Sequence, residues 1–259
     1  MINASALQPV IIEPLKVIEI LSQGNRNYKI EYSQGADSVP EAVEELSYRM
    51  LLMDSDLKGI INGLRVLYDN NIEGFHFDLR TFSKESKGSI VRLFKDMYGI
   101  VTEVFYNDEC DTLIGKISLN PRAHKFIDGQ YMEIGIKKVV HNVLTRLGKL
   151  YNKKFNLYSN VIIFDEKRIA KNEFDLIIEN ESDGIIYFLE VKTEKGFRDS
   201  DKLEKMGKEY GIAPNRLFLV DNHKSAKIVE QLEYFSGYHW ANLDNNLENK
   251  IAAMLENDL

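Results

Sequence analysis

Two carboxylates and one ammonium group interrupt the most apolar stretch of the chain. Asp175 lies within NEFDLIIEN, and Glu190 and Lys192 lie within IIYFLEVKT, with the turn-forming residues SDG between the two segments. This pattern predicts a β-hairpin. Because side chains alternate along a strand, Glu190 and Lys192 project from one face. Asp175 on the neighbouring strand is then expected within about 4.5–8 Å of them at Cβ.

Two carboxylates this close both stay ionised only when a cation lies between them. Mg²⁺ and Mn²⁺ fit, since hard divalent ions bind carboxylate and carbonyl oxygens. Asp175, Glu190 and the backbone carbonyl of Val191 are therefore the predicted metal ligands, and Lys192 the group that orients a metal-bound water. Such a site hydrolyses phosphodiesters. The alternative is an exposed edge hairpin with an ordinary cross-strand ion pair, although the apolar flanks make burial of these charges costly.

The elements that position these residues follow from hydrophobic periodicity. The second half predicts a long amphipathic helix at about 130–150, a strand at 156–165 and the hairpin. It then predicts a helix with Gly211 as its C-cap, a short buried strand NRLFLVD in the middle of a sheet, and two more helices. This order is typical of an α/β fold in which helices flank a mixed, restriction-endonuclease-like sheet.

The first half predicts a smaller α+β domain. NYKIEYSQG has the pattern of a strand, residues 39–68 form two helices that MDSD separates, and IEGFHFDLR is a strand. A helix with Gly99 as its C-cap and a hairpin around NDECD follow. The predicted boundary lies near Asn120, which gives domains 1–120 and 121–259.

Composition narrows the class of protein. The 259 residues are 44% hydrophobic and 28% charged, and the net charge is −7. Residues 1–120 hold 12 basic residues against 18 acidic ones, so the rest is nearly neutral and can carry a local basic face. The one cysteine, Cys110, excludes an intrachain disulfide and a cysteine-rich zinc site. Without a signal peptide or a long apolar run, we expect a cytoplasmic protein and no membrane partner.

The order of these motifs resembles the PD-(D/E)xK nuclease superfamily. Asp175, preceded here by Phe174 in place of proline, matches the first motif, and Glu190-Val191-Lys192 matches the second. The resemblance implies a metal-dependent endonuclease. It also implies a further acid on the first core helix, a place that Glu133 fills in FIDGQYMEIGIKKVV, where it binds a metal directly or through water. The alternative for Glu133 is a first-turn acid that favours the helix N-terminus.

Residues from Phe126 to Val220 resemble, more narrowly, the nuclease domain of the CRISPR ancillary nucleases that carry a CARF sensor. The shared boxes are Asn172-Glu173-Phe174-Asp175 and Glu190-Val191-Lys192-Thr193. The resemblance implies a homodimer in a defence context that cleaves single-stranded or nicked DNA or RNA once a cyclic oligoadenylate binds. Domain 1–120 would then be a regulatory or dimerisation region, either a reduced CARF-like domain or a connector.

Three lysines are candidate contacts for nucleic acid: Lys137, Lys202 and Lys205. Lys137 is alternatively an i,i+4 partner of Glu133, and the other two are alternatively a solvated helix face. Two other functions remain open. One is a protein that binds nucleic acid or a signal on the same fold without cleaving, and the other is a resolvase- or restriction-type nuclease that needs no activating ligand.

Overall fold

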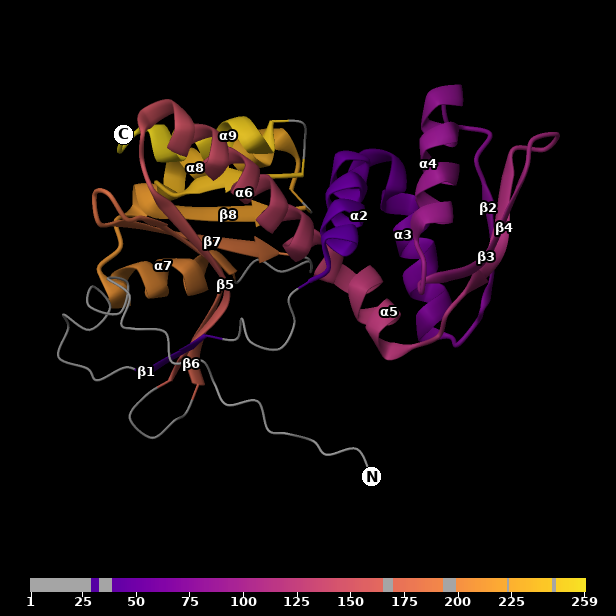
Figure 1. The fold of residues 1–259 in the computed structure, drawn as a ribbon, viewed down its shortest axis with the longest axis horizontal. Helices are drawn as coiled ribbons and strands as arrows, with labels where there is room; N and C mark the ends of the chain where they lie inside the picture. Colours follow the sequence, from indigo (N-terminus) through magenta and orange to yellow (C-terminus); the bar gives the residue numbers. More distant parts are fainter. Residues whose placement is uncertain (1–28, 33–38, 165–169, 193–198, 223, 244–245) are drawn as a thin grey trace. The chain divides into compact units, whose positions relative to one another are not determined.

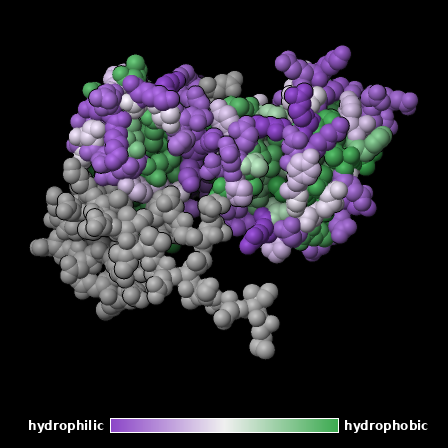
Figure 2. Space-filling model, in the orientation of Figure 1, coloured by the Kyte–Doolittle hydropathy of each residue, from purple (hydrophilic) through white to green (hydrophobic). Residues whose placement is uncertain are grey.

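The computed structural model describes residues 29–32, 39–164, 170–192, 199–222, 224–243 and 246–259 (Figure 1). The chain divides into two compact units. The larger comprises Met1–Val39 together with Val139–Leu259, and the smaller comprises Pro40–Lys138. Among the described helices, none has both the length and the apolar character needed to cross a lipid bilayer. On the face drawn in Figure 2, hydrophilic residues predominate and hydrophobic ones show between them.

A six-stranded mixed sheet forms the centre of the larger unit, in the order β1-β5-β6-β7-β8-β9. Its strands are β1 (Lys29–Tyr32), β5 (Phe155–Phe164), β6 (Ala170–Asn180), β7 (Ile185–Lys192), β8 (Leu217–Asp221) and β9 (His239–Ala241). The strands from β1 to β7 pair antiparallel, whereas β7, β8 and β9 pair parallel. The predicted strand NRLFLVD is β8, which is buried along its whole length inside the sheet.

Helices cover both faces of this sheet. They are α6 (Tyr131–Tyr151), α7 (Asp199–Tyr210), α8 (Ala226–Ser236) and α9 (Leu247–Glu256). Figure 1 shows α7 on one side of the sheet and α6 and α9 on the other. Parallel strands need a crossover, and α7 and α8 supply it between β7 and β8 and between β8 and β9. Gly211 follows α7 in the left-handed conformation (φ 68°), as its predicted C-cap requires.

The smaller unit packs helices against a three-stranded antiparallel sheet of order β2-β4-β3. Its elements are α2 (Glu41–Leu52), α3 (Asp54–Asp69), β2 (Gly74–Asp78), α4 (Lys84–Asp96), β3 (Val101–Asn107), β4 (Thr112–Ile117) and α5 (Pro121–Lys125), with a π-helical turn at Phe126–Gln130. The predicted split at MDSD and the predicted hairpin are both present. The fold class is therefore confirmed: α/β, with a helix-flanked mixed sheet and a smaller α+β unit.

The compact units divide the chain at other places than the predicted domains 1–120 and 121–259. β1 pairs with β5 and so belongs to the larger sheet. The first two turns of α6 belong to the smaller unit, because Gly135 lets α6 approach α2 closely. A Cβ at Gly135 would lie 2.8 Å from the carbonyl oxygen of Ser47. Because α6 starts in one unit and ends in the other, its hydrophobic periodicity is continuous across the boundary and does not mark it.

One predicted helix end is wrong, and one strand was not predicted. α4 ends at Asp96 with Met97 as its C-cap, and Gly99 (φ 81°) instead forms the turn before β3. A left-handed glycine serves a tight turn as well as a helix C-cap, so the residue type alone does not separate the two. β9 has three residues, which is too short for an alternating pattern to show.

Candidate active site in the hairpin

The β6–β7 hairpin opens at the position of the predicted site. Its register runs from Asn180↔Ile185 up to Leu176↔Leu189, and within these two described strands it goes no further. Asp175 and Glu190 are the next residues on either side. The pairing of β6 with β7 therefore ends where the two carboxylates stand. From there to Lys192, β7 is paired, among the described strands, only with β8.

Asp175 bridges this opening with its side chain. Its Oδ2 atom accepts a hydrogen bond from the backbone N–H of Val191 at 2.6 Å. The carboxylate thus takes the place of the backbone carbonyl that would accept this N–H in a regular ladder. Hydrogen bonds to ionised acceptors are shorter and stronger than those between neutral groups. In a strand the N–H and C=O of one residue point to the same side. The carbonyl of Val191 is therefore directed towards the side on which Asp175 lies, as its predicted ligand role requires.

Glu190 is a buried charge with a cation beside it. Its relative exposure is 3%, and the Nζ atom of Lys192 donates to its Oε1 atom at 2.8 Å. The two residues are separated by one position, so their side chains leave the same face of β7. An unpaired carboxylate at this depth would be strongly destabilising. The exposed edge hairpin considered as an alternative does not describe this burial.

An aromatic cluster holds the separated strands in place. Phe174 of β6 and Phe188 of β7 lie with their ring centroids 4.3 Å apart, and Tyr210 of α7 packs edge-on against both. The amide of Asn172 donates to the hydroxyl of Tyr210 at 2.6 Å. Asn172 thus links β6 to α7. Within the predicted Asn-Glu-x-Asp box, Asn172 has a structural contact and Asp175 supplies the carboxylate of the candidate site. Glu173, between them, is exposed.

A third acid, Asp221, was missed in the sequence. It ends β8, lies opposite Lys192 in the parallel register and is 4% exposed. Lys224 approaches it, with 3.9 Å between Nζ and Oδ2. The sequence feature that could have identified it is an acid directly after the apolar run LFLV. Ligand sites in α/β sheets lie at the carboxyl ends of parallel strands.

The other predicted residues divide between the two units. Glu133 and Lys137 are partly buried on the first turns of α6, which cluster with the smaller unit. Their part in the site stays a prediction. Lys205 is exposed on α7, while the side chain of Lys202 and all of Thr193 lie outside the described residues. The structure thus brings together Asp175, Glu190, Val191 and Lys192.

The donor set suits a hard divalent ion. It consists of two carboxylates and one backbone carbonyl, which are the ligands that Mg²⁺ and Mn²⁺ take together with water. Among the described residues, no group of three or more histidine, cysteine, aspartate and glutamate side chains is placed to hold a metal ion.

Comparison with known proteins gives a fold and no family. No protein-family model matches the chain, and no curated protein matches it. Among solved structures, it is similar to protein VC1899 from Vibrio cholerae, with a TM-score of 0.58 and 15% identity over 93% of this chain and 60% of that one. It is also similar to Can2 from Sulfobacillus thermosulfidooxidans in complex with cyclic tetra-adenylate. That match has a TM-score of 0.55 and 12% identity over 88% of this chain and 56% of Can2.

At such identities the likeness shows the fold alone. The chain spans about 60% of the length of the first of these proteins and 56% of the second. Both matches cover most of the present chain, so the likeness extends to elements of both units. The chemistry of the site rests on this chain's own residues.

The hydrogen bond from Val191 to Asp175 predicts a difference between two substitutions. Asp175→Ala removes the acceptor and leaves a partly buried N–H unpaired, which is expected to cost about 1–3 kcal/mol of unfolding free energy. Asp175→Asn keeps an oxygen acceptor and most of that stability. Urea unfolding followed by the fluorescence of Trp240, the single tryptophan, reports on the larger unit. Equal midpoints for the two variants would show that this hydrogen bond does not support the hairpin.

Proposed function

We propose that the chain is a metal-dependent endonuclease that hydrolyses phosphodiester bonds of single-stranded or nicked nucleic acid. The observation that carries the proposal is the buried Glu190 carboxylate, paired with Lys192 at the point where Asp175 bridges the opened strands. The resemblance of both sequence motifs to the PD-(D/E)xK superfamily supports it independently. The fold shared with Can2 is consistent with it.

Asp175, Glu190 and the carbonyl of Val191 would hold the Mg²⁺ or Mn²⁺ ion. Bound there, the ion lowers the pKa of a water molecule and polarises the phosphate. The protein's own contribution is to fix three oxygens and one cation in a partly water-excluded place. Electrostatic stabilisation is strongest in such a place, because the charges need no rearrangement during the reaction.

Lys192 has two tasks in this arrangement. Through Glu190 it is held in one orientation, since its Nζ atom lies 2.8 Å from the carboxylate. From this position an ammonium group, with three N–H donors, orients the attacking water and stabilises the negative charge that grows on the phosphate. Lys192 is partly exposed, with 18% of its side chain accessible, whereas the Glu190 side chain is only 4% accessible. The lysine is therefore the more accessible of the two, as contact with a substrate would require.

A cyclic oligoadenylate is the proposed activator. Can2, which shares the fold, has been seen in complex with cyclic tetra-adenylate, and the sequence boxes resemble nucleases that such molecules switch on. A homodimer is proposed with it, since two such sites side by side can cut two strands.

Cleavage should depend on both charged partners in β7. With Mn²⁺, the wild type is expected to cleave single-stranded DNA, single-stranded RNA or nicked plasmid, whereas Glu190→Gln and Lys192→Ala lose at least about 100-fold in rate, as is common for groups that stabilise a transition state. The control is Lys227→Ala, on the exposed face of α8. Circular dichroism confirms that each variant is folded.

Full Mn²⁺-dependent activity in folded Lys192→Ala protein would contradict the assignment of Lys192. Absence of cleavage by the wild type on every substrate, with and without activator, would favour the alternative in which the chain binds without cutting.

Activation predicts a rate that depends on ring size. Adding cyclic tri-, tetra- and hexa-adenylate separately to the cleavage assay should raise the rate with one ring and leave it unchanged with the others, because a ligand shifts activity only as far as it binds the active state better. Linear tetra-adenylate is the control. A rate indifferent to every ring would identify a nuclease that needs no ligand.

A further inference from the structure

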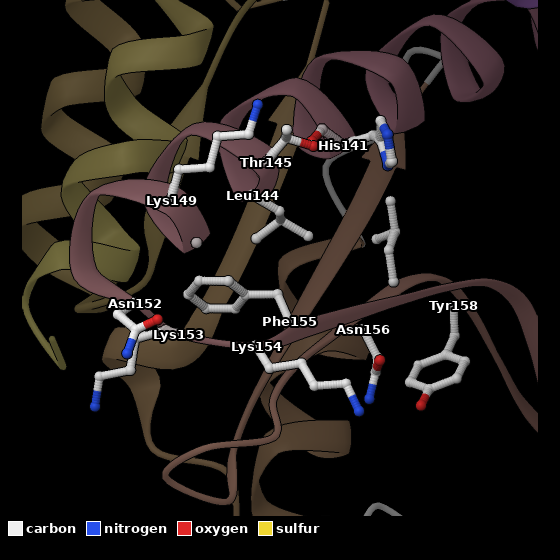
Figure 3. Close-up of a pocket in the computed structure, with 12 residues that line it drawn as sticks. His141, Leu144, Thr145, Lys149, Asn152, Lys153, Lys154, Phe155, Asn156 and Tyr158 are labelled. Atoms are coloured by element: carbon white, nitrogen blue, oxygen red, sulfur yellow. The ribbon is translucent and has the colours of Figure 1, made fainter.

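A cavity of about 730 Å³ lies between the last turns of α6 and the start of β5 in the larger unit. Its walls include His141, Thr145 and Lys149 from α6 and Lys154, Asn156 and Tyr158 from the segment that opens β5 (Figure 3). None of the hairpin's charged residues lines it. The cavity is thus a second feature of the same unit, and the proposed site does not account for it.

The end of α6 builds this cavity. Asn152 adopts the left-handed conformation (φ 52°), and the N–H of Lys153 donates to the carbonyl of Gly148 at 3.1 Å. This is the bond of a Schellman cap, which turns the chain back sharply. His141, Thr145 and Lys149 follow one another at every fourth position, so they form one stripe of the helix above the reversed chain.

In the part of the chain that the structure describes, this stripe carries one uncompensated positive charge, that of Lys149. Among the described residues, the side chains of His141 and Lys149 have neither a hydrogen bond nor an ion pair, and both residues are exposed. The other two cations of the cavity are already paired: Lys153 with Asp183 at 2.8 Å and Lys154 with Glu181 at 2.7 Å. Lys149 is therefore the main cation that an incoming anion would meet.

Below the stripe, the start of β5 gives the cavity an aromatic wall in Phe155. Asn156 and the hydroxyl of Tyr158 both donate to the Oε2 atom of Glu179, at 3.0 and 2.9 Å. Glu179 is 3% exposed, so both donors are taken up by a buried charge, and the Tyr158 side chain packs against the hydrophobic core. In Figure 3 the ring of Phe155 lies beside Leu144, and the ring of Tyr158 lies farther along β5. Cationic groups that track a phosphate backbone, with aromatic rings on which bases stack, are typical of single-strand binding sites.

β5 leads directly from the cavity to the hairpin site. Its register places Ser159 opposite Leu176 and Val161 opposite Phe174, so Asn160 stands beside Asp175. Among the described strands, β1 pairs with β5 only from Val161 onward. From Asn156 to Asn160 the strand rises about 13 Å, which a few nucleotides span.

We propose that this cavity holds the phosphate backbone of a single strand of nucleic acid a few nucleotides away from the bond that is cut at the hairpin. Lys149 contacts a phosphate, with His141 as a second donor, and the ring of Phe155 lines the place where a base would lie. This inference rests on the proposed nuclease function and assigns the place where its substrate is gripped.

The test measures binding apart from cleavage. In the full-length Glu190→Gln protein, fluorescence anisotropy with labelled oligothymidylate and oligouridylate of about 16 nucleotides compares Lys149→Glu with Lys227→Glu, an exposed lysine of α8 without a side-chain partner among the described residues. We expect Lys149→Glu to weaken binding about tenfold. It should also reduce the slope of log K against log salt by about 0.7, the value for one phosphate contact with a single strand. Lys227→Glu should change neither.

Equal affinity and equal salt slope for the two charge reversals would overturn the proposal. A larger loss on one of the two oligonucleotides identifies the preferred nucleic acid and supports the cavity as its site. The cavity assignment and the nuclease function are overturned by different outcomes. If the wild type cuts but Lys149→Glu binds normally, the cavity assignment is wrong and the nuclease stands. If Lys149→Glu weakens binding but the wild type never cuts, the binding site stands without the nuclease.

Discussion

Burial of the Glu190 charge is the constraint on which the rest of the site depends. A carboxylate at 3% exposure is stable only with a compensating partner, and Lys192 supplies one from the same face of the same strand. Glu190 and Lys192 can both lie on β7 only if this strand extends beyond the end of its pairing with β6. The parallel partner β8 makes this possible, because it supports β7 from the other side up to Lys192.

Asp175 satisfies the backbone of β7 beyond the end of its pairing with β6. Where the ladder ends, β7 has a backbone N–H without a strand partner on the β6 side, and the carboxylate of Asp175 accepts it. The side chain of Asp175 thus joins the two strands where their backbones no longer pair, and it provides the acceptor that the N–H of Val191 needs. The aromatic packing of Phe174, Phe188 and Tyr210 keeps both strands in place just beside it. The result is that Asp175 and Glu190 stand together at the point where the β6–β7 ladder ends.

Much of this was predictable from the sequence, because the hairpin is marked by local signals. Two apolar runs and a polar turn specify β6 and β7, and the alternation of strands places Glu190 and Lys192 on one face. The role of Asp221 was not predicted, since its nearness to Lys192 depends on a parallel register created by the crossover through α7. The contact between Asp175 and Val191 was equally hidden, because it depends on where the ladder stops. The pairing of β1 with β5 joins residues far apart in the chain, and no local pattern reports such a pairing.

The central claim is that Asp175 and Glu190 together bind a divalent ion. Electron paramagnetic resonance tests it directly, because free Mn²⁺ gives a six-line spectrum in solution that weakens on binding. Titrating Mn²⁺ into the full-length wild type should remove signal saturably, and Asp175→Asn and Glu190→Gln should each restore most of it while the protein stays folded. A wild-type spectrum identical to that of Mn²⁺ in buffer, or binding that neither substitution weakens, would contradict the account.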